Sequence, residues 1–316
     1  MASKTAAPKM PTPIRRRLLK RQIQRSVPYY VLLALPLAFL FIFHYMPMWG
    51  LQIAFRDFQS QTSVFQMPWR GLHYFQQFFS SALFWQYFRN TVAIAFYSLI
   101  AGFPLPIILA ICLNECRSLR FKKTVQMVTY MPYFITTVVL VSMILQFTAR
   151  ETGVVNNIIA YFGGSRIDFM ARTEYFRHIF VWTGIWQSTG FSAIIYLAAL
   201  SGISPDLVDA AKVDGCNKWR RVWHIDLPGI MPTIIILLIL NISSLVNVGF
   251  ERIFLMQNPF NLSVSEVLST YIWRVGISGG NYSFAAAAGL FNNLIAFSLI
   301  IIANFTARRV SETSLW

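Results

Sequence analysis

Charged residues are scarce in this chain of 316 residues. Asp, Glu, Lys and Arg make up 12% of the sequence, whereas soluble domains carry about 25% charged residues. Hydrophobic residues make up 56%, and the mean hydropathy is +0.52. This balance excludes an ordinary soluble domain and predicts a membrane protein.

The sequence also lacks the motifs of most enzymes. Its four histidines lie far apart, and no Ser, His and Asp arrangement for nucleophilic catalysis is evident. No Gly-x-x-x-x-Gly-Lys loop is present, so the chain does not bind ATP in the P-loop manner. We therefore expect no enzymatic activity and no cofactor in this chain, and any energy from ATP must come through another subunit.

Long apolar runs are what the chain does have. Six of them contain no Asp, Glu, Lys or Arg: residues 29–49, 91–113, 125–147, 179–200, 229–250 and 284–307. Since one charge at the bilayer centre costs roughly 2.5 to 3.5 kcal/mol on insertion scales, six clean runs predict an all-α membrane protein with six transmembrane helices. The lack of ionisable groups inside them argues against a proton- or ion-driven carrier.

The basic residues indicate how these spans are oriented. With a cytoplasmic N-terminus, 18 of the 27 Lys and Arg residues fall on the inner side. The positive-inside rule therefore predicts cytoplasmic termini, with a basic tail at residues 1–28, a six-helix domain at residues 29–307 and a short tail at residues 308–316. The charge of +15 indicates contact with anionic lipids and not with nucleic acid, because the basic tail lacks interleaved aromatic residues.

The three cysteines fall at or near the predicted cytoplasmic side, where thiols stay reduced, so we expect no disulfide. Cys112 and Cys116 are four residues apart, but only Glu115 accompanies them and no histidine is near. A metal site is therefore not expected.

The first predicted outer loop, residues 50–90, is long and rich in aromatic residues. Part of this aromatic content is typical of the membrane interface. Within the loop, the sequence WRGLHYFQQFF predicts a short helix along the outer surface, where an external partner could dock.

Prolines and uncharged polar residues interrupt the apolar spans. Pro104, Pro106, Pro132 and Pro232 are expected to disturb their helices, and broken helices either line a cavity or only aid packing. Polar side chains in the fourth and fifth spans likewise either face a water-filled path or hydrogen-bond neighbouring helices. These alternatives stay open at this level.

The segment of residues 201–228, a cytoplasmic loop in the predicted topology, has the pattern of two short helices with a glycine joint. Ser204 can cap a helix that begins at Pro205, and Gly215 can end it. Asn217 can cap a second helix that Pro228 is expected to stop.

This segment resembles the cytoplasmic loop of permease subunits of ABC importers. The loop pattern is Glu-Ala-Ala, three residues, Gly, nine residues, Ile, one residue and Leu-Pro. The chain matches every spacing, with Asp in place of Glu at the first position: Asp209, Ala210, Ala211, Gly215, Ile225, Leu227 and Pro228. The aspartate keeps the charge but is one methylene shorter, so its carboxylate reaches less far.

Further segments extend the resemblance over most of the chain. VGFERIFLMQNP, TYIWRVGI and YSFAAAAGLFNNLIAFSLIIIANFTARR resemble the polysaccharide-uptake branch of that family, the LplB-like and MalF-related permeases. That branch includes the permeases for alginate and other oligosaccharides, and the best single match is the first permease subunit of an alginate importer.

The resemblance implies a type I importer permease fold in the bacterial cytoplasmic membrane. It implies a second, similar permease, two ATPase subunits that bind ATP and Mg, a periplasmic or lipid-anchored binding protein, and an oligo- or polysaccharide substrate. The ATPases would dock on the 201–228 segment. The spans that flank it contact sugar in related permeases, so five residues are expected to line the path: Gln187, Phe191, Asn241, Ser244 and Asn247.

The predicted outer loops hold nine basic and six acidic residues, and this mild positive field suits an acidic sugar chain. The alternative functions are the membrane subunit of an exporter or channel and a membrane scaffold without transport activity.

Overall fold

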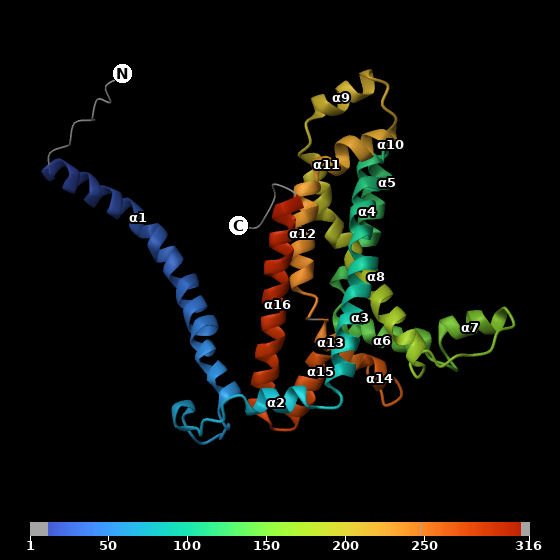
Figure 1. Ribbon diagram of the computed structural model, residues 1–316. Coiled ribbons are helices and arrows are strands. Elements are labelled where there is room, and N and C mark those ends of the chain that lie inside the picture. The colour runs from blue at the N-terminus through green and yellow to red at the C-terminus, as the bar shows by residue number, and fades with distance from the viewer. Residues whose placement is uncertain (1–11, 247, 311–316) are drawn as a thin grey trace.

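The computed structural model describes residues 12–246 and 248–310 of the chain. These residues form helices and connecting turns, and the only β-type pairing among them is an isolated bridge between Arg56 and Trp69. Figure 1 shows the long helices running side by side, with α9 and α10 near one end of the bundle and α2 at the other. These ends are called the α9 end and the α2 end below.

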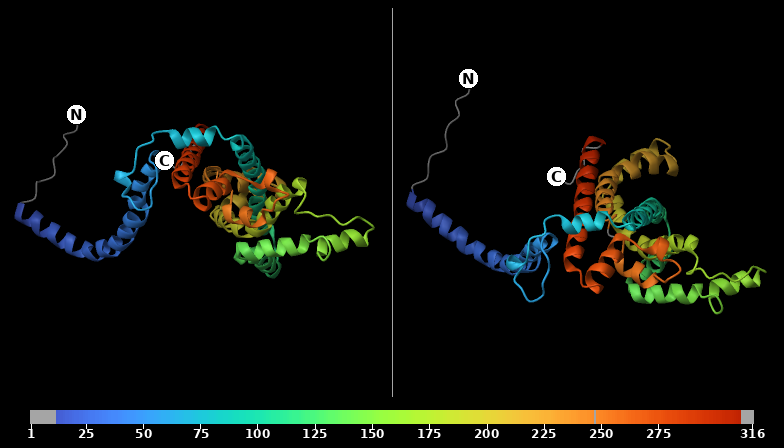
Figure 2. Two further views of the ribbon diagram at one scale, coloured as in Figure 1. Left: turned by 90° about the horizontal axis from the view of Figure 1, so that it is seen from below. Right: turned by 60° about the horizontal axis from the view of Figure 1, so that its bottom comes forward.

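The first apolar run lies in a long helix that stands apart from the bundle. Helix α1 spans Thr12–Leu40, and the chain continues as a π-helix at Phe41–Tyr45 and a 3-10 helix at Met46–Phe55. Figures 1 and 2 show α1 separated from the other helices, and the apolar window in Ile23–Phe55 buries none of its residues. Such a helix needs lipid or another protein to cover it.

The second apolar run forms one nearly continuous span from two helices. Helix α3 covers Phe84–Gly102 and helix α4 covers Pro104–Glu115. The predicted disturbance at Pro104 and Pro106 is a local one, because both prolines lie in the first turn of α4, where a missing N–H is tolerated. The whole of Phe84–Glu115 is long and apolar enough to cross a membrane.

The third run is broken near Pro132, as expected for this proline, so residues 125–147 do not form one continuous helix. Helix α5 (Leu119–Tyr130) is followed by a 3-10 turn (Met131–Phe134) that contains Pro132, and then by helix α6 (Thr137–Thr148). The two parts are bent by 100°. The break is stabilised because Gln187 donates a 2.8 Å hydrogen bond from Nε2 to the Ile135 carbonyl, which has no helical partner.

The fourth run is the α8 helix, Thr173–Ser201, and it turns by 73° into helix α9, Pro205–Val213. The fifth run is shorter than predicted. Helix α12 covers Met231–Ser243, and its axis is bent by 61° from the helical stretch before it. The predicted C-terminal end of the helix at residues 229–250 is wrong, because the helix ends at Ser243.

Helix α16, Tyr282–Val310, forms the last run. Among the described residues, three helices are long and apolar enough to cross a membrane, or up to six if each of the three bent pairs is one span.

Short helices lie toward the α2 end and between the long ones. Helix α2 confirms the short helix predicted in the aromatic loop, and α7 projects from the bundle on the side away from α1 (Figure 2). Their bounds are 3-10 Val64–Gln66, α2 His73–Phe79, α7 Val154–Tyr161, α13 Phe250–Met256, α14 Leu262–Ser265, α15 Leu268–Ile272 and π Trp273–Ser278.

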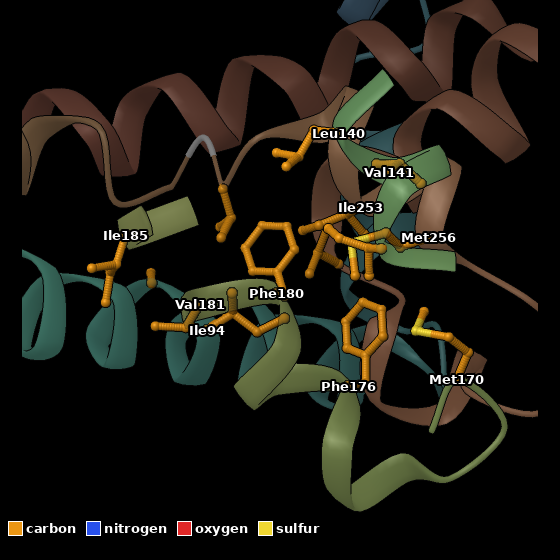
Figure 3. Packing of buried hydrophobic residues seen from close by; sticks show 14 residues of the cluster. Ile94, Leu140, Val141, Met170, Phe176, Phe180, Val181, Ile185, Ile253 and Met256 are labelled. Carbon is orange, nitrogen blue, oxygen red and sulfur yellow. The ribbon is translucent and has the colours of Figure 1, made fainter. Parts of the chain in front are cut away.

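A buried hydrophobic cluster joins α3, α6, α8 and α13. Figure 3 shows Phe176 and Phe180 of α8 facing Ile253 and Met256 of α13, and Phe176 and Ile253 are fully buried. Close packing of large side chains leaves little freedom in how these helices sit. The cluster therefore fixes α13 against α8, next to the cavity described below.

Candidate functional site

A cavity of about 520 Å³ lies between α3, α4, α8 and α12 and is called the central cavity here. Its volume falls within the range of about 300 to 1,000 Å³ that is usual for ligand pockets. Polar and small residues form much of its wall: Ser98, Gly102, Gly184, Gln187, Ser188, Ser192, Asn241, Ser244, Gly249 and Arg252.

The polar side chains of the cavity use their donors on nearby backbone carbonyls. Asn241 Nδ2 donates to the Leu237 carbonyl at 2.7 Å, and the Ser244 hydroxyl donates to the Asn241 carbonyl at 2.8 Å. Gln187 holds the Ile135 carbonyl in the same way. No described residue donates to the amide oxygens of Gln187 and Asn241, so these oxygens can accept hydrogen bonds from a hydroxyl-rich ligand.

The structure brings three of the five expected path residues together, because Gln187, Asn241 and Ser244 all line the central cavity. Phe191 is not in that lining. Its ring stacks on Tyr133, with centroids 3.9 Å apart and planes 5° apart. Asn247 lies outside the described residues.

Sequence reasoning missed Arg252, which also lines the central cavity. The expected fifth span ran to residue 250, so this arginine counted only as an outer-loop charge. In the structure the chain unwinds after Ser243, passes through Gly249 with a φ of +71°, and begins α13 at Phe250. The signal for it in the sequence is a single arginine within the apolar stretch FERIFLM.

The 201–228 segment forms the predicted helix, glycine joint and helix. After α9, Gly215 adopts a φ of +74°, its N–H donates to the Lys212 carbonyl, and the Cys216 N–H donates to the Ala211 carbonyl at 2.9 Å. This pair of bonds is a Schellman motif with glycine at C′. Asn217 caps the second helix, because its Oδ1 accepts from the Arg220 N–H at 2.8 Å.

Two details of the 201–228 segment differ from the prediction. Ser204 precedes α9, but its side chain makes no capping hydrogen bond, so the expected cap is wrong; Pro205 at the first position still favours the helix start. Pro228 does not stop the second helix. Helix α10 (Lys218–Arg221) continues as a π-helix (Val222–Asp226) and then as α11 (Leu227–Gly229). Pro228 lies in the first turn of α11, where a missing backbone N–H is tolerated.

The outer face of the 201–228 segment is open to solvent. Asp209, Ala210 and Pro228 are exposed, whereas Ala211, Ile225 and Leu227 are half-buried. The Lys212 ammonium donates to Asp209 Oδ1 at 2.7 Å, and both side chains are exposed, so this pair contributes at most about 1 kcal/mol. The Asp209 carboxylate is therefore available to exchange partners.

Ion pairs attach the second helix of this segment to α4. Arg221 contacts Glu115 at the end of α4, and its Nε lies 3.3 Å from Asp226 Oδ2. Lys218 Nζ lies 3.8 Å from Glu115 Oε2. Because α4 also lines the central cavity, the two regions are mechanically connected.

Residues 102–312 match a protein family described as "Binding-protein-dependent transport system inner membrane component". These residues include α8 and α12 of the central cavity and the whole 201–228 segment. The chain belongs to this family. The predicted identity as a permease subunit of binding-protein-dependent transport is therefore confirmed.

Individual relatives of the permease agree with the predicted LplB-like branch. The permease is 39% identical over 294 residues to Protein LplB of Bacillus subtilis (strain 168), covering 93% of this chain and 92% of that protein. It is 37% identical over 302 residues to the polygalacturonan/rhamnogalacturonan transport system permease protein YteP of the same organism, covering 96% and 94%.

Solved structures also resemble the permease. One is a crystal structure of a bacterial ABC transporter involved in the import of the acidic polysaccharide alginate, with a TM-score of 0.86, 38% identity and coverage of 93% of this chain and 99% of that one. Another is a bacterial alginate ABC transporter in complex with an alginate pentasaccharide-bound periplasmic protein, with a TM-score of 0.85 and 37% identity over the same shares.

Proposed function

We propose that this permease is one of two membrane subunits of an ATP-driven importer for an acidic oligo- or polysaccharide. The observation that carries the proposal is the central cavity, whose polar wall is built from α8 and α12, the two helices on either side of the 201–228 segment. A passage lined by hydroxyl and amide groups suits a sugar. The chain has no P-loop of its own, so the energy of ATP must come from another subunit.

The proposed topology has six spans, each bent pair being one span, with both termini in the bacterial cytoplasm. The surplus of basic residues on that side supports it. In this arrangement the basic tail at residues 1–28 and the tail at residues 308–316 are cytoplasmic, residues 29–307 form the permease domain, and the aromatic loop at residues 50–90 is periplasmic.

A cytoplasmic ATPase is the proposed partner of the 201–228 segment. Its exposed face combines a weakly paired carboxylate at Asp209 with small side chains at Ala210 and Ala211, which allow another protein to approach closely. Trp219 is 76% exposed and offers a large apolar contact. The ATPases would supply ATP and Mg binding, while Gly215, Ile225, Leu227 and Pro228 set the shape of the docking face.

A second permease is the proposed partner on the membrane side. Helix α1 stands away from the bundle with its apolar window uncovered, and aromatic side chains at Phe134, Tyr161 and Phe162 are strongly exposed. Lipid covers part of such a surface, and a homologous subunit covers the part next to the path.

The proposed path residues are Gln187, Phe191, Asn241, Ser244 and Asn247. The amide oxygens of Gln187 and Asn241 supply acceptors for sugar hydroxyls, and the stacked rings of Phe191 and Tyr133 offer a flat apolar face for a sugar ring. An acidic substrate is supported by the relatives that handle polygalacturonan and alginate, both of them acidic polymers.

Reconstitution tests the proposal. The permease is purified with its second permease, ATPases and binding protein, placed in liposomes, and supplied from outside with oligouronates and neutral oligosaccharides. We expect a binding-protein-loaded oligouronate to stimulate ATP hydrolysis and to accumulate inside. Movement in the opposite direction, or passage without ATP, would contradict import and favour an exporter or a channel.

A further inference from the structure

The Arg252 side chain occupies a site that the surrounding helices have shaped for it. Helix α13 is fixed against α8 by the buried side chains of Ile253 and Met256, which places Arg252 on the wall of the central cavity. Its guanidinium carbon lies 3.9 Å from the centre of the Phe180 ring, a cation–π contact.

Gly184 provides the room for this guanidinium. A Cβ atom at position 184 would lie 2.6 Å from Arg252 Nη2 and 2.9 Å from Cζ, so the guanidinium would have to shift. Phe180 and Gly184 are one helical turn apart on α8, so the ring and the bare backbone form a continuous cradle. A helix interior disfavours glycine by about 1 kcal/mol relative to alanine. The room that Gly184 leaves for the Arg252 side chain explains why a glycine occupies this position.

Arg252 differs from other arginines of the structure in having no anionic partner. Arg70 pairs with Asp57, Arg274 with Glu266 and Arg221 with Glu115 and Asp226. Among the described residues, none forms an ion pair or a hydrogen bond with the Arg252 side chain. A half-buried cation without a counter-charge is costly, and the cation–π contact offsets only part of that cost.

We propose that Arg252 binds a carboxylate group of the transported saccharide and selects for uronate units. The guanidinium fork matches a carboxylate with two parallel hydrogen bonds, which a neutral sugar cannot provide. The amide and hydroxyl groups of Gln187, Asn241 and Ser244 in the same cavity serve the sugar hydroxyls. This inference rests on the proposed saccharide import and adds the residue that binds the carboxylate of the substrate.

The test uses the complete complex, with both permeases, the ATPases and the binding protein, in liposomes. The probes are a 1,4-linked uronate tetrasaccharide and its carboxyl-reduced counterpart, and uptake of each is measured with wild type, Arg252→Gln, Arg252→Lys and the control Arg172→Gln. Arg172 is an exposed arginine outside the cavity lining, so its variant has the same loss of charge elsewhere.

Loss of one charge-assisted contact corresponds to about a tenfold effect or more. We expect Arg252→Gln to reduce uronate uptake by at least this factor, Arg252→Lys to retain part of it, and Arg172→Gln to match wild type. The melting temperature of each assembled complex shows whether Arg252→Gln remains folded. Should it not, the Arg252→Lys variant and Gly184→Ala, which displaces the guanidinium, must each lower uronate uptake relative to wild type.

Two results would overturn the inference and leave import intact: wild-type rates of uronate uptake with Arg252→Gln, or a wild-type complex that transports only the carboxyl-reduced probe. If the wild-type complex transports neither probe nor any other saccharide, the proposed function itself fails together with the inference.

Discussion

Arg221 lies between two carboxylates, Glu115 at the end of α4 and Asp226 in the 201–228 segment. The Asp226 side chain is only 3% exposed and that of Arg221 16%, so the cluster is largely removed from water. Because α4 lines the central cavity, this cluster joins the 201–228 segment to an element of the cavity wall. The proposed ATPase docking face and the proposed path are therefore linked by ion pairs.

Replacing Arg221 should be strongly destabilising. Arg221→Met leaves the buried Asp226 carboxylate without a cation and Glu115 with only the exposed Lys218, and breaking such a cluster typically costs about 3 to 5 kcal/mol. The melting temperature of the purified complex should fall, and saccharide-stimulated ATP hydrolysis should be lost. The neighbouring exposed Arg220, changed to Met, is the control. Equal melting temperatures for the two variants would contradict a structural role for the cluster.

Gly215 should tolerate asparagine but not a β-branched residue. Its φ of +74° is unfavourable for L-residues by roughly 1 to 2 kcal/mol, while asparagine enters this region more readily. Among the described residues, no neighbouring atom lies within 4 Å of a Cβ built there, so any effect arises from the backbone and not from a clash. Gly215→Val should lose saccharide-stimulated ATP hydrolysis and still insert in the membrane, whereas Gly215→Asn should stay close to wild type. Saccharide-stimulated ATP hydrolysis at the wild-type rate in Gly215→Val would contradict the docking proposal.

The leucine variants of Gln187 and Asn241 should differ in stability. Gln187→Leu leaves the Ile135 carbonyl unpaired at the break of the third span, at a cost of about 1 to 3 kcal/mol, so the complex should be less stable. The Asn241 amide donates only to a carbonyl of its own helix, so Asn241→Leu should preserve stability. The variant should take up less saccharide, while the ATP hydrolysis that occurs without the binding protein should stay at the wild-type rate. Asn157→Leu, outside the cavity, is the control. Wild-type uptake by Asn241→Leu would remove this residue from the path.

Glu266 should make stability depend on pH. Its side chain is 2% exposed, and burial raises its pKa above the ordinary 4.5, although Arg274 at 2.7 Å opposes the shift. In the unfolded chain the carboxyl loses its proton at lower pH than in the folded protein, so folding becomes less favourable as pH rises from 4.5 through the folded pKa. The stability of wild type relative to Glu266→Gln should fall over that interval. A difference that stays constant with pH, in melting temperatures of the two complexes, would exclude this effect.

Local features of the fold follow from the sequence. The six apolar runs, the short helix at α2, the cap at Asn217 and the Schellman turn at Gly215 depend on residues that are near one another in the chain. For the same reason the 201–228 segment could be placed by spacing alone. The expected path residues Gln187, Asn241 and Ser244 were chosen because the spans that flank this segment contact sugar in the permeases that the chain resembles.

Tertiary structure decided the rest. The disturbance at Pro132 was predicted. Hydropathy records only how apolar a run is, however, so neither the size of that bend, 100°, nor the unwinding after Ser243 was predicted. The break is stable because Gln187, from a different helix, bonds the exposed carbonyl of Ile135. Likewise, the Arg252 guanidinium lies against Phe180 and Gly184, which belong to a different helix. Contacts between distant segments determine these features, and no local pattern encodes them.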